Sequence, residues 1–111
     1  MKNGFLHQDL ARGRWYKMSL MEQLGNIGSE VGRARIYQDK NDKGQFQKAA
    51  DRALELFDLT LADPRWRGRL LEIGRARDVF CDAVLGGSEY GSKLSELESY
   101  FMHFAIAARR N

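Results

Sequence analysis

The chain has 111 residues, of which 43% are hydrophobic and 30% charged, and its formal net charge is +3. These values are typical of one folded, water-soluble domain and exclude a disordered chain. A single cysteine excludes an internal disulfide, and the sequence has neither an apolar run of membrane-spanning length nor a signal-peptide segment. We therefore expect a cytoplasmic protein that has no contact with a membrane.

The first long helix is predicted over residues 20–39. Residues 1–14 before it have mixed polarity and are interpreted as an N-terminal arm, and residues 15–111 as the folded domain. Ser19 and Glu22 form an S-x-x-E capping box, which marks the beginning of a helix. Apolar residues then recur at spacings of three and four, which predicts one buried face made of Leu20, Leu24, Ile27, Val31 and Ala34.

Residues with almost no side chain lie beside this apolar face, namely Gly25, Gly28, Ser29 and Gly32. A glycine inside a helix costs about 1 kcal/mol relative to alanine, so three of them in one helix need compensation. The usual compensation is the close approach of another helix or of a ligand to the bare backbone. We therefore expect this helix to be the centre of a bundle.

Two further helices are separated by the Asp63-Pro64 step. A turn at residues 41–44 precedes a helix predicted over residues 45–62. Aspartate is a favoured N-cap and proline a favoured first helical residue, so a third helix is predicted over residues 64–85. Because the residue before a proline is pushed out of the helical region, the second helix must end there.

The fourth helix, predicted over residues 93–109, is unusually apolar. Between residues 100 and 108 only His103 is strongly polar. A helix that is apolar nearly all round is either enclosed by its own bundle or pressed against another subunit. We therefore expect a homo-oligomer whose interface is formed by Tyr100, Met102, Ala105 and Ile106.

No segment alternates between apolar and polar residues in the manner of a half-buried strand. Four helices joined by short connections place sequence neighbours antiparallel. The sequence thus predicts an all-α protein, an antiparallel up-down-up-down four-helix bundle.

Glu55 and Asp58 form an E-x-x-D pair that could contribute oxygen ligands to Mg²⁺. The pair is similar to one half of the carboxylate pattern of MazG-type all-α nucleotide pyrophosphohydrolases, but no earlier helix carries the E-x-x-E half. The alternative is that these acids pair with arginines three or four residues away. His7, Cys81 and His103 lack zinc-ligand spacing, so we expect no metal or other cofactor and no catalytic residues.

The densest basic segment contains Arg65, Trp66, Arg67 and Arg69. Arginines beside an aromatic ring can neutralise phosphates and stack on a base. Arginines spaced two apart fan over roughly 200° of a helix, so the three cannot all face one internal acid. Cations at a helix beginning oppose the helix dipole, so an anion should compensate them. That anion is a neighbouring acid, nucleic acid or an acidic partner; a solvated face is the alternative.

Three runs of residues, LGNIGSEVGRA, RALELFDLTLADPR and YFMHFAIAARR, resemble those of small prokaryotic four-helix-bundle proteins. Over residues 15–109 the chain is similar in length, helix number and basic character to the Avd-type accessory proteins of diversity-generating retroelements. The resemblance implies a ring-like homo-oligomer that binds a reverse transcriptase and nucleic acid, and it transfers no individual site residue. The sequence therefore predicts a non-catalytic oligomeric accessory or binding module, with a Mg²⁺-dependent MazG-like hydrolase as the alternative.

Overall fold

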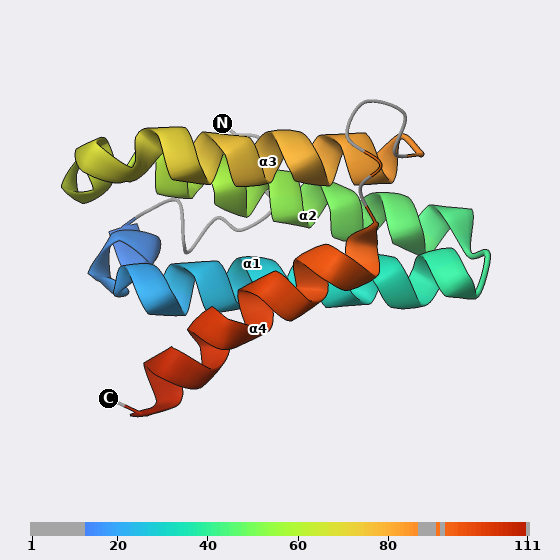
Figure 1. The fold of residues 1–111 in the computed structure, drawn as a ribbon, viewed down its shortest axis with the longest axis horizontal. Coiled ribbons are helices and arrows are strands. Elements are labelled where there is room, and N and C mark those ends of the chain that lie inside the picture. The colour runs from blue at the N-terminus through green and yellow to red at the C-terminus, as the bar shows by residue number, and fades with distance from the viewer. Residues whose placement is uncertain (1–12, 87–90, 92, 111) are drawn as a thin grey trace.

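The computed structural model describes residues 13–86, 91 and 93–110, so the predicted arm at 1–14 lies almost wholly outside the described residues. These residues contain no strand. The four α-helices alternate in direction along the chain (Figure 1), which confirms the predicted all-α up-down-up-down bundle. Their bounds are α1 (Leu20–Asp39), α2 (Lys43–Leu61), α3 (Leu70–Val84) and α4 (Leu94–Arg110), with short 3-10 segments η2 (Trp15–Lys17) and η3 (Pro64–Arg69).

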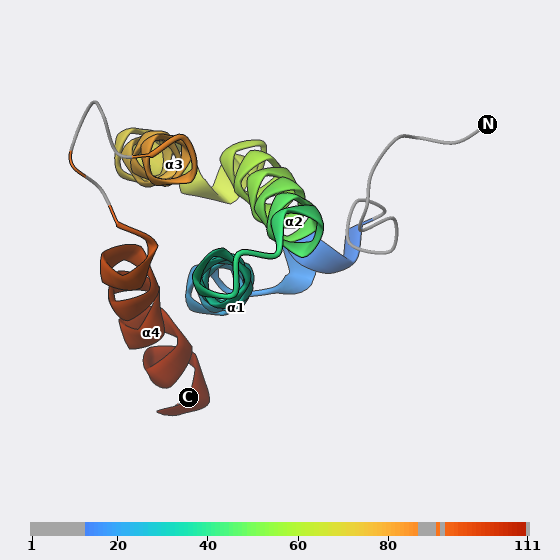
Figure 2. The same cartoon turned by 90° about the vertical axis from the view of Figure 1, so that its right-hand side faces the viewer.

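The helix α1 lies between α2 and α4 and makes the most extensive contacts with both of them (Figure 2). The helix α3 packs mainly on α2 and touches α4 only lightly. In Figure 1, α4 crosses α1 obliquely and diverges from the other helices toward its C-terminal end. The bundle is therefore tightly closed on the α1 side of α4 and open between α3 and α4.

The predicted beginning and buried face of α1 are both confirmed. The Ser19 hydroxyl accepts a hydrogen bond from the Glu22 amide at 3.1 Å, and the Glu22 carboxylate accepts one from the Ser19 amide at 3.0 Å. This capping box satisfies amides that have no partner inside the helix. All five residues of the predicted apolar face are buried.

The glycines of α1 are the surface on which α4 packs. A Cβ atom added to Gly28 would lie 2.5 Å from the Cβ of Phe101, and one added to Gly25 would lie 3.2 Å from the Cα of Ala105. Only a residue without a side chain allows this approach. The compensation expected for the helical glycines is therefore a close helix–helix contact within the chain.

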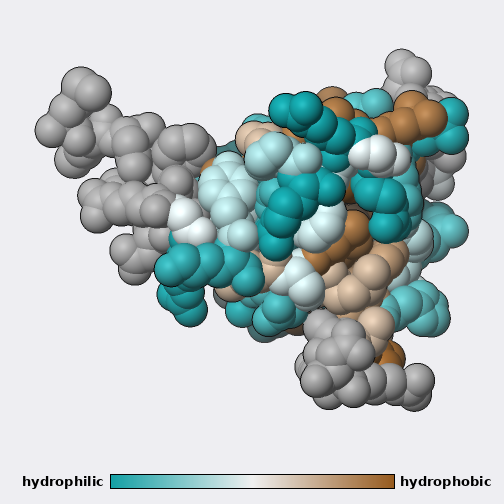
Figure 3. All heavy atoms as spheres, turned by 90° about the vertical axis from the view of Figure 1, so that its left-hand side faces the viewer, coloured by the Kyte–Doolittle hydropathy of each residue, from teal (hydrophilic) through white to brown (hydrophobic). Residues whose placement is uncertain are grey.

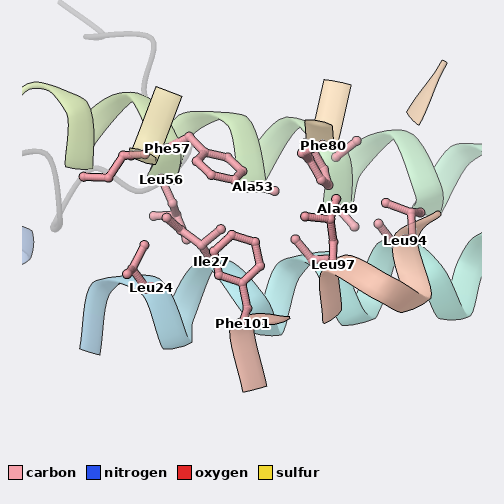
Figure 4. Packing of buried hydrophobic residues seen from close by; sticks show 14 of the residues in the cluster. Leu24, Ile27, Ala49, Ala53, Leu56, Phe57, Phe80, Leu94, Leu97 and Phe101 are labelled. Carbon is pink, nitrogen blue, oxygen red and sulfur yellow. The ribbon is translucent and has the colours of Figure 1, made fainter. Parts of the chain in front are cut away.

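Three fully buried aromatic rings, one each from α2, α3 and α4, pack against one another in the core. Phe57 of α2 lies 5.8 Å, between ring centroids, from both Phe80 of α3 and Phe101 of α4. Figure 4 shows Phe101 reaching from α4 toward Ile27 and Phe57. Such tilted and edge-on pairs add to the hydrophobic stabilisation of the core.

Two predicted helix boundaries are wrong. The second helix begins at Lys43, two residues early, because the Asp42 side chain caps it by accepting from the Gln45 amide. The third α-helix begins at Leu70 rather than at Pro64. Trp66, with φ −105° and ψ 24°, interrupts the helical backbone within η3. The helical register therefore restarts after η3, which leaves Leu70 40% exposed.

Candidate functional site

Asp63 organises the residues before α3. Its carboxylate is buried and accepts hydrogen bonds from the guanidinium of Arg65 at 2.7 Å, from the Arg65 amide at 3.0 Å and from the Gln23 amide group at 3.1 Å. The Arg65 guanidinium also donates to the Met18 carbonyl oxygen at 2.7 Å. The hydrogen bond from Arg65 holds the pKa of Asp63 below its usual value, although burial acts in the opposite direction.

Gln23 connects both tryptophans to this carboxylate. Its Nε2 donates to the Trp15 carbonyl oxygen at 2.9 Å, and its Oε1 accepts from the Trp66 indole nitrogen at 2.8 Å. Sequence reasoning missed Gln23 because it considered only apolar residues for the buried face. The available signal was its position four residues before Ile27, which places it on that face. The network fastens η2 and η3 to α1, so its role is structural.

Two of the three predicted anion-binding arginines are paired within the chain. Arg65 holds Asp63, and its guanidinium lies 4.5 Å from the ring centroid of Trp66. Arg69 donates to Glu72 at 2.9 Å. Arg67 is exposed and makes no ion pair with any residue that the structure describes. Acids of the chain itself thus compensate the positive charge at Arg65 and Arg69, and Arg67 extends into solvent.

Carboxylates of α1 and α2 are bonded to arginines. Asp58 accepts a hydrogen bond from Arg77 of α3 at 2.9 Å. Glu30 of α1 accepts from Arg33 at 3.0 Å and from Arg52 of α2 at 3.2 Å. Within residues 13–86, 91 and 93–110, no three histidine, cysteine or acidic side chains are grouped so as to hold a metal ion. Asp58, part of the MazG-like pair with Glu55, therefore serves as a cross-helix ion-pair partner here.

The four predicted interface residues of α4 do not share one face. Tyr100 lies beside α3, whereas Met102 lines a shallow groove between α1 and α4. These two side chains point roughly 160° apart around the helix. Ala105 is half-buried against Gly25 of the same chain, and Ile106 is 42% exposed. Met102 and Ile106 can meet one partner surface, but that surface cannot also cover Tyr100.

An open pocket of about 530 Å³ lies between α3 and α4, and we call it the α3–α4 pocket. It exists because α3 and α4 pack only lightly against each other. Figure 3 shows hydrophobic surface in this region, surrounded by hydrophilic side chains. The lining is mainly apolar and consists of Gly68, Leu71, Glu72, Arg75, Ala76, Val79, Leu97 and Tyr100.

The charges at the α3–α4 pocket are unequally compensated. The hydrogen bond from Arg69 lowers the pKa of Glu72, which therefore stays ionised. Burial, together with the negative charge of Glu72, raises the pKa of Tyr100, whose hydroxyl interacts with that carboxylate and stays protonated. Arg75 is exposed and has no ion-pair partner among the described residues. The pocket wall therefore carries one uncompensated positive charge.

Comparisons of the chain with protein-family models, with curated proteins and with solved structures find no match. The resemblance to Avd-type accessory proteins stays a prediction. Among the residues that the structure describes, no helix is long and apolar enough to cross a membrane.

Proposed function

We propose that this chain is a self-associating helical-bundle module that binds a partner and catalyses no reaction. The observation that supports it most directly is an exposed apolar strip on the α1–α4 side of the bundle. Its residues are Ile36, Met102 and Ile106, which are 41%, 48% and 42% exposed. Ile36 and Met102 line one groove between α1 and α4, and Ile106 follows Met102 by about one helical turn. Exposed large apolar side chains beside a groove are typical of a surface that another protein covers.

The shape of this side of the molecule suits a second copy of the chain. The groove beside the strip has a volume of about 270 Å³ and a floor that includes Gly25, Gly28 and Gly32. In a two-fold dimer the same surface meets itself, so the strip of one copy can lie along the groove of the other. Burial of apolar surface is the main favourable contribution to such an association.

We propose the absence of catalysis because carboxylates of α1 and α2 are paired with arginines. A Mg²⁺-dependent hydrolase needs carboxylates that are free to coordinate the ion. Asp58 is instead engaged by Arg77, and Glu30 by Arg33 and Arg52. Each ion pair would have to break before metal could bind. Association with nucleic acid is a narrower proposal that depends on Arg67, which, unlike Arg65 and Arg69, makes no ion pair with a described residue.

Light scattering after size-exclusion chromatography tests the self-association. At micromolar concentration the wild type should have a mass of at least two chains of 12.7 kDa each. Replacing Met102 and Ile106 together by glutamate should give a folded monomer, because charges cannot be buried unpaired in the contact. Leu85→Glu is the matched control, since Leu85 is 82% exposed but lies at the end of α3.

Three results would contradict this proposal. A wild-type protein that is monomeric at high micromolar concentration would remove self-association itself. A double variant that stays oligomeric would place the interface elsewhere. Dissociation by Leu85→Glu to the same degree would indicate that any added charge disperses the protein. Circular dichroism on each variant establishes that the helices are intact.

A further inference from the structure

We propose that the α3–α4 pocket binds a small aliphatic carboxylate, a molecule with an apolar chain and one anionic group. The inference rests on three observations, which are the volume and lining of the pocket, the single uncompensated charge at its wall, and the open space beside Gly68. It is independent of self-association, because the strip formed by Ile36, Met102 and Ile106 lies on the other side of α4.

The volume and lining fit the apolar part of such a molecule. Small-molecule sites typically have volumes of about 300–1,000 Å³ and walls that are mostly hydrophobic with a few polar groups. The α3–α4 pocket, at about 530 Å³, lies in this range. Leu71, Val79 and Leu97 form much of its apolar wall. Leu71 is 71% exposed, so a bound chain would remove a large apolar side chain from water.

The charges determine which end group the pocket accepts. Glu72 already accepts from Arg69 at 2.9 Å and interacts with the Tyr100 hydroxyl. A cationic ligand would therefore compete with Arg69 for Glu72 and would be repelled by Arg75. An anionic ligand meets Arg75, whose guanidinium can donate two parallel hydrogen bonds to a carboxylate.

Arg75 lies three residues from both Glu72 and Asp78, a spacing at which ion pairs can form along a helix. In the structure Glu72 forms an ion pair with Arg69 instead, and Arg75 forms no ion pair with any described residue. Arg75 is therefore the one charged side chain of the pocket lining whose charge a ligand can still compensate. An uncharged apolar molecule would fill the same volume but would leave Arg75 without an anion.

Gly68 of η3 adds no side chain to the lining of the pocket. A Cβ atom added there would have no neighbour within 4 Å. The space beside Gly68 is therefore open to a bound chain.

Isothermal titration calorimetry with decanoate, decanol and decyltrimethylammonium tests the proposal, with the two ions kept below their micelle concentrations and decanol below its solubility limit. We expect saturable binding of decanoate by the wild type, weaker binding of decanol and weakest binding of the cation. Arg75→Gln should weaken decanoate binding about tenfold, as expected for one charge-assisted contact, and leave decanol binding unchanged. Arg67→Gln is the matched control, an exposed unpaired arginine outside the lining, and should bind decanoate like the wild type.

A second variant tests the apolar part of the pocket. Ala76→Phe adds a ring to the lining and should reduce the binding of decanoate and decanol alike, whereas Gly74→Phe, on the same helix but outside the lining, should not. Circular dichroism shows whether each variant retains its helices, and the Arg75→Gln result is decisive if Ala76→Phe does not fold.

The proposal is overturned if the wild type shows no saturable binding of decanoate. It is also overturned if decanol binds as tightly as decanoate, or if Arg75→Gln and Arg67→Gln have equal effects. The Met102→Glu/Ile106→Glu double variant should bind decanoate normally, so failure of the self-association proposal is distinguishable from failure of this one.

Discussion

Replacing Gly28 by alanine should destabilise the protein, although alanine is the better helix former. The new methyl group would lie 2.5 Å from the Cβ of Phe101, an atom held close to the α4 backbone. Phe101 is fully buried and its ring packs on Phe57, so it cannot move aside alone. The helix α4 would have to move away from α1 along their shared contact.

The magnitude follows from comparison with Gly74→Ala in α3, where an added Cβ meets nothing within 4 Å. Both substitutions gain about 1 kcal/mol from helix propensity. Only Gly28→Ala adds the cost of overpacking, typically about 1–3 kcal/mol. We therefore expect Gly74→Ala to stabilise the protein, and Gly28→Ala to be less stable than Gly74→Ala by about 1–3 kcal/mol.

Urea unfolding followed by circular dichroism measures both free energies of unfolding under the same conditions. Gly32→Ala provides an intermediate case, because the atom it meets, at 2.7 Å, is the Glu98 carboxylate oxygen at the end of a flexible side chain. Glu98 can rotate away, at the expense of its ion pair with Arg35. If Gly28→Ala stabilised the protein as much as Gly74→Ala does, the close α1–α4 contact would not exist in solution.

Three further outcomes are expected. The pKa of Asp63 is lower in the folded state than in the unfolded state, so its contribution to stability is present above the unfolded value near 4 and is lost as the pH falls through the folded value. In urea unfolding, the wild type should therefore lose more stability than Asp63→Asn between pH 7 and pH 3. Equal losses in the two proteins would contradict this. If a short labelled RNA or DNA binds in fluorescence anisotropy, Arg67→Gln should weaken the binding and flatten its salt dependence. The effect should be nearly as large as that of replacing Arg65, Arg67 and Arg69 together. No binding at low salt would exclude nucleic acid as the partner. Millimolar Mg²⁺ should leave the melting temperature unchanged, whereas an increase of several degrees would favour the hydrolase alternative.

Local features of the sequence determined where α1 lies and which face it buries. The capping box at Ser19 and Glu22 and the apolar spacing of three and four are interactions within one helix, so they can be read without knowing the fold. The glycines of α1 likewise indicated a close neighbour, because the free-energy cost of glycine in a helix does not depend on the rest of the fold. They could not indicate that the neighbour is α4, and Asp63-Pro64 could not indicate that η3 rather than an α-helix follows.

Only the tertiary structure decided which charges are paired and where the surface is open. Arg52 reaches Glu30 of α1 and Arg77 reaches Asp58 of α2, pairs that join different helices. Spacing along the chain limits which residues share a helix face, but the distance and crossing angle between helices determine which side chains meet. The same geometry separates Tyr100 from Met102 and leaves the α3–α4 pocket, because α4 follows the bare backbone of α1 and diverges from α3.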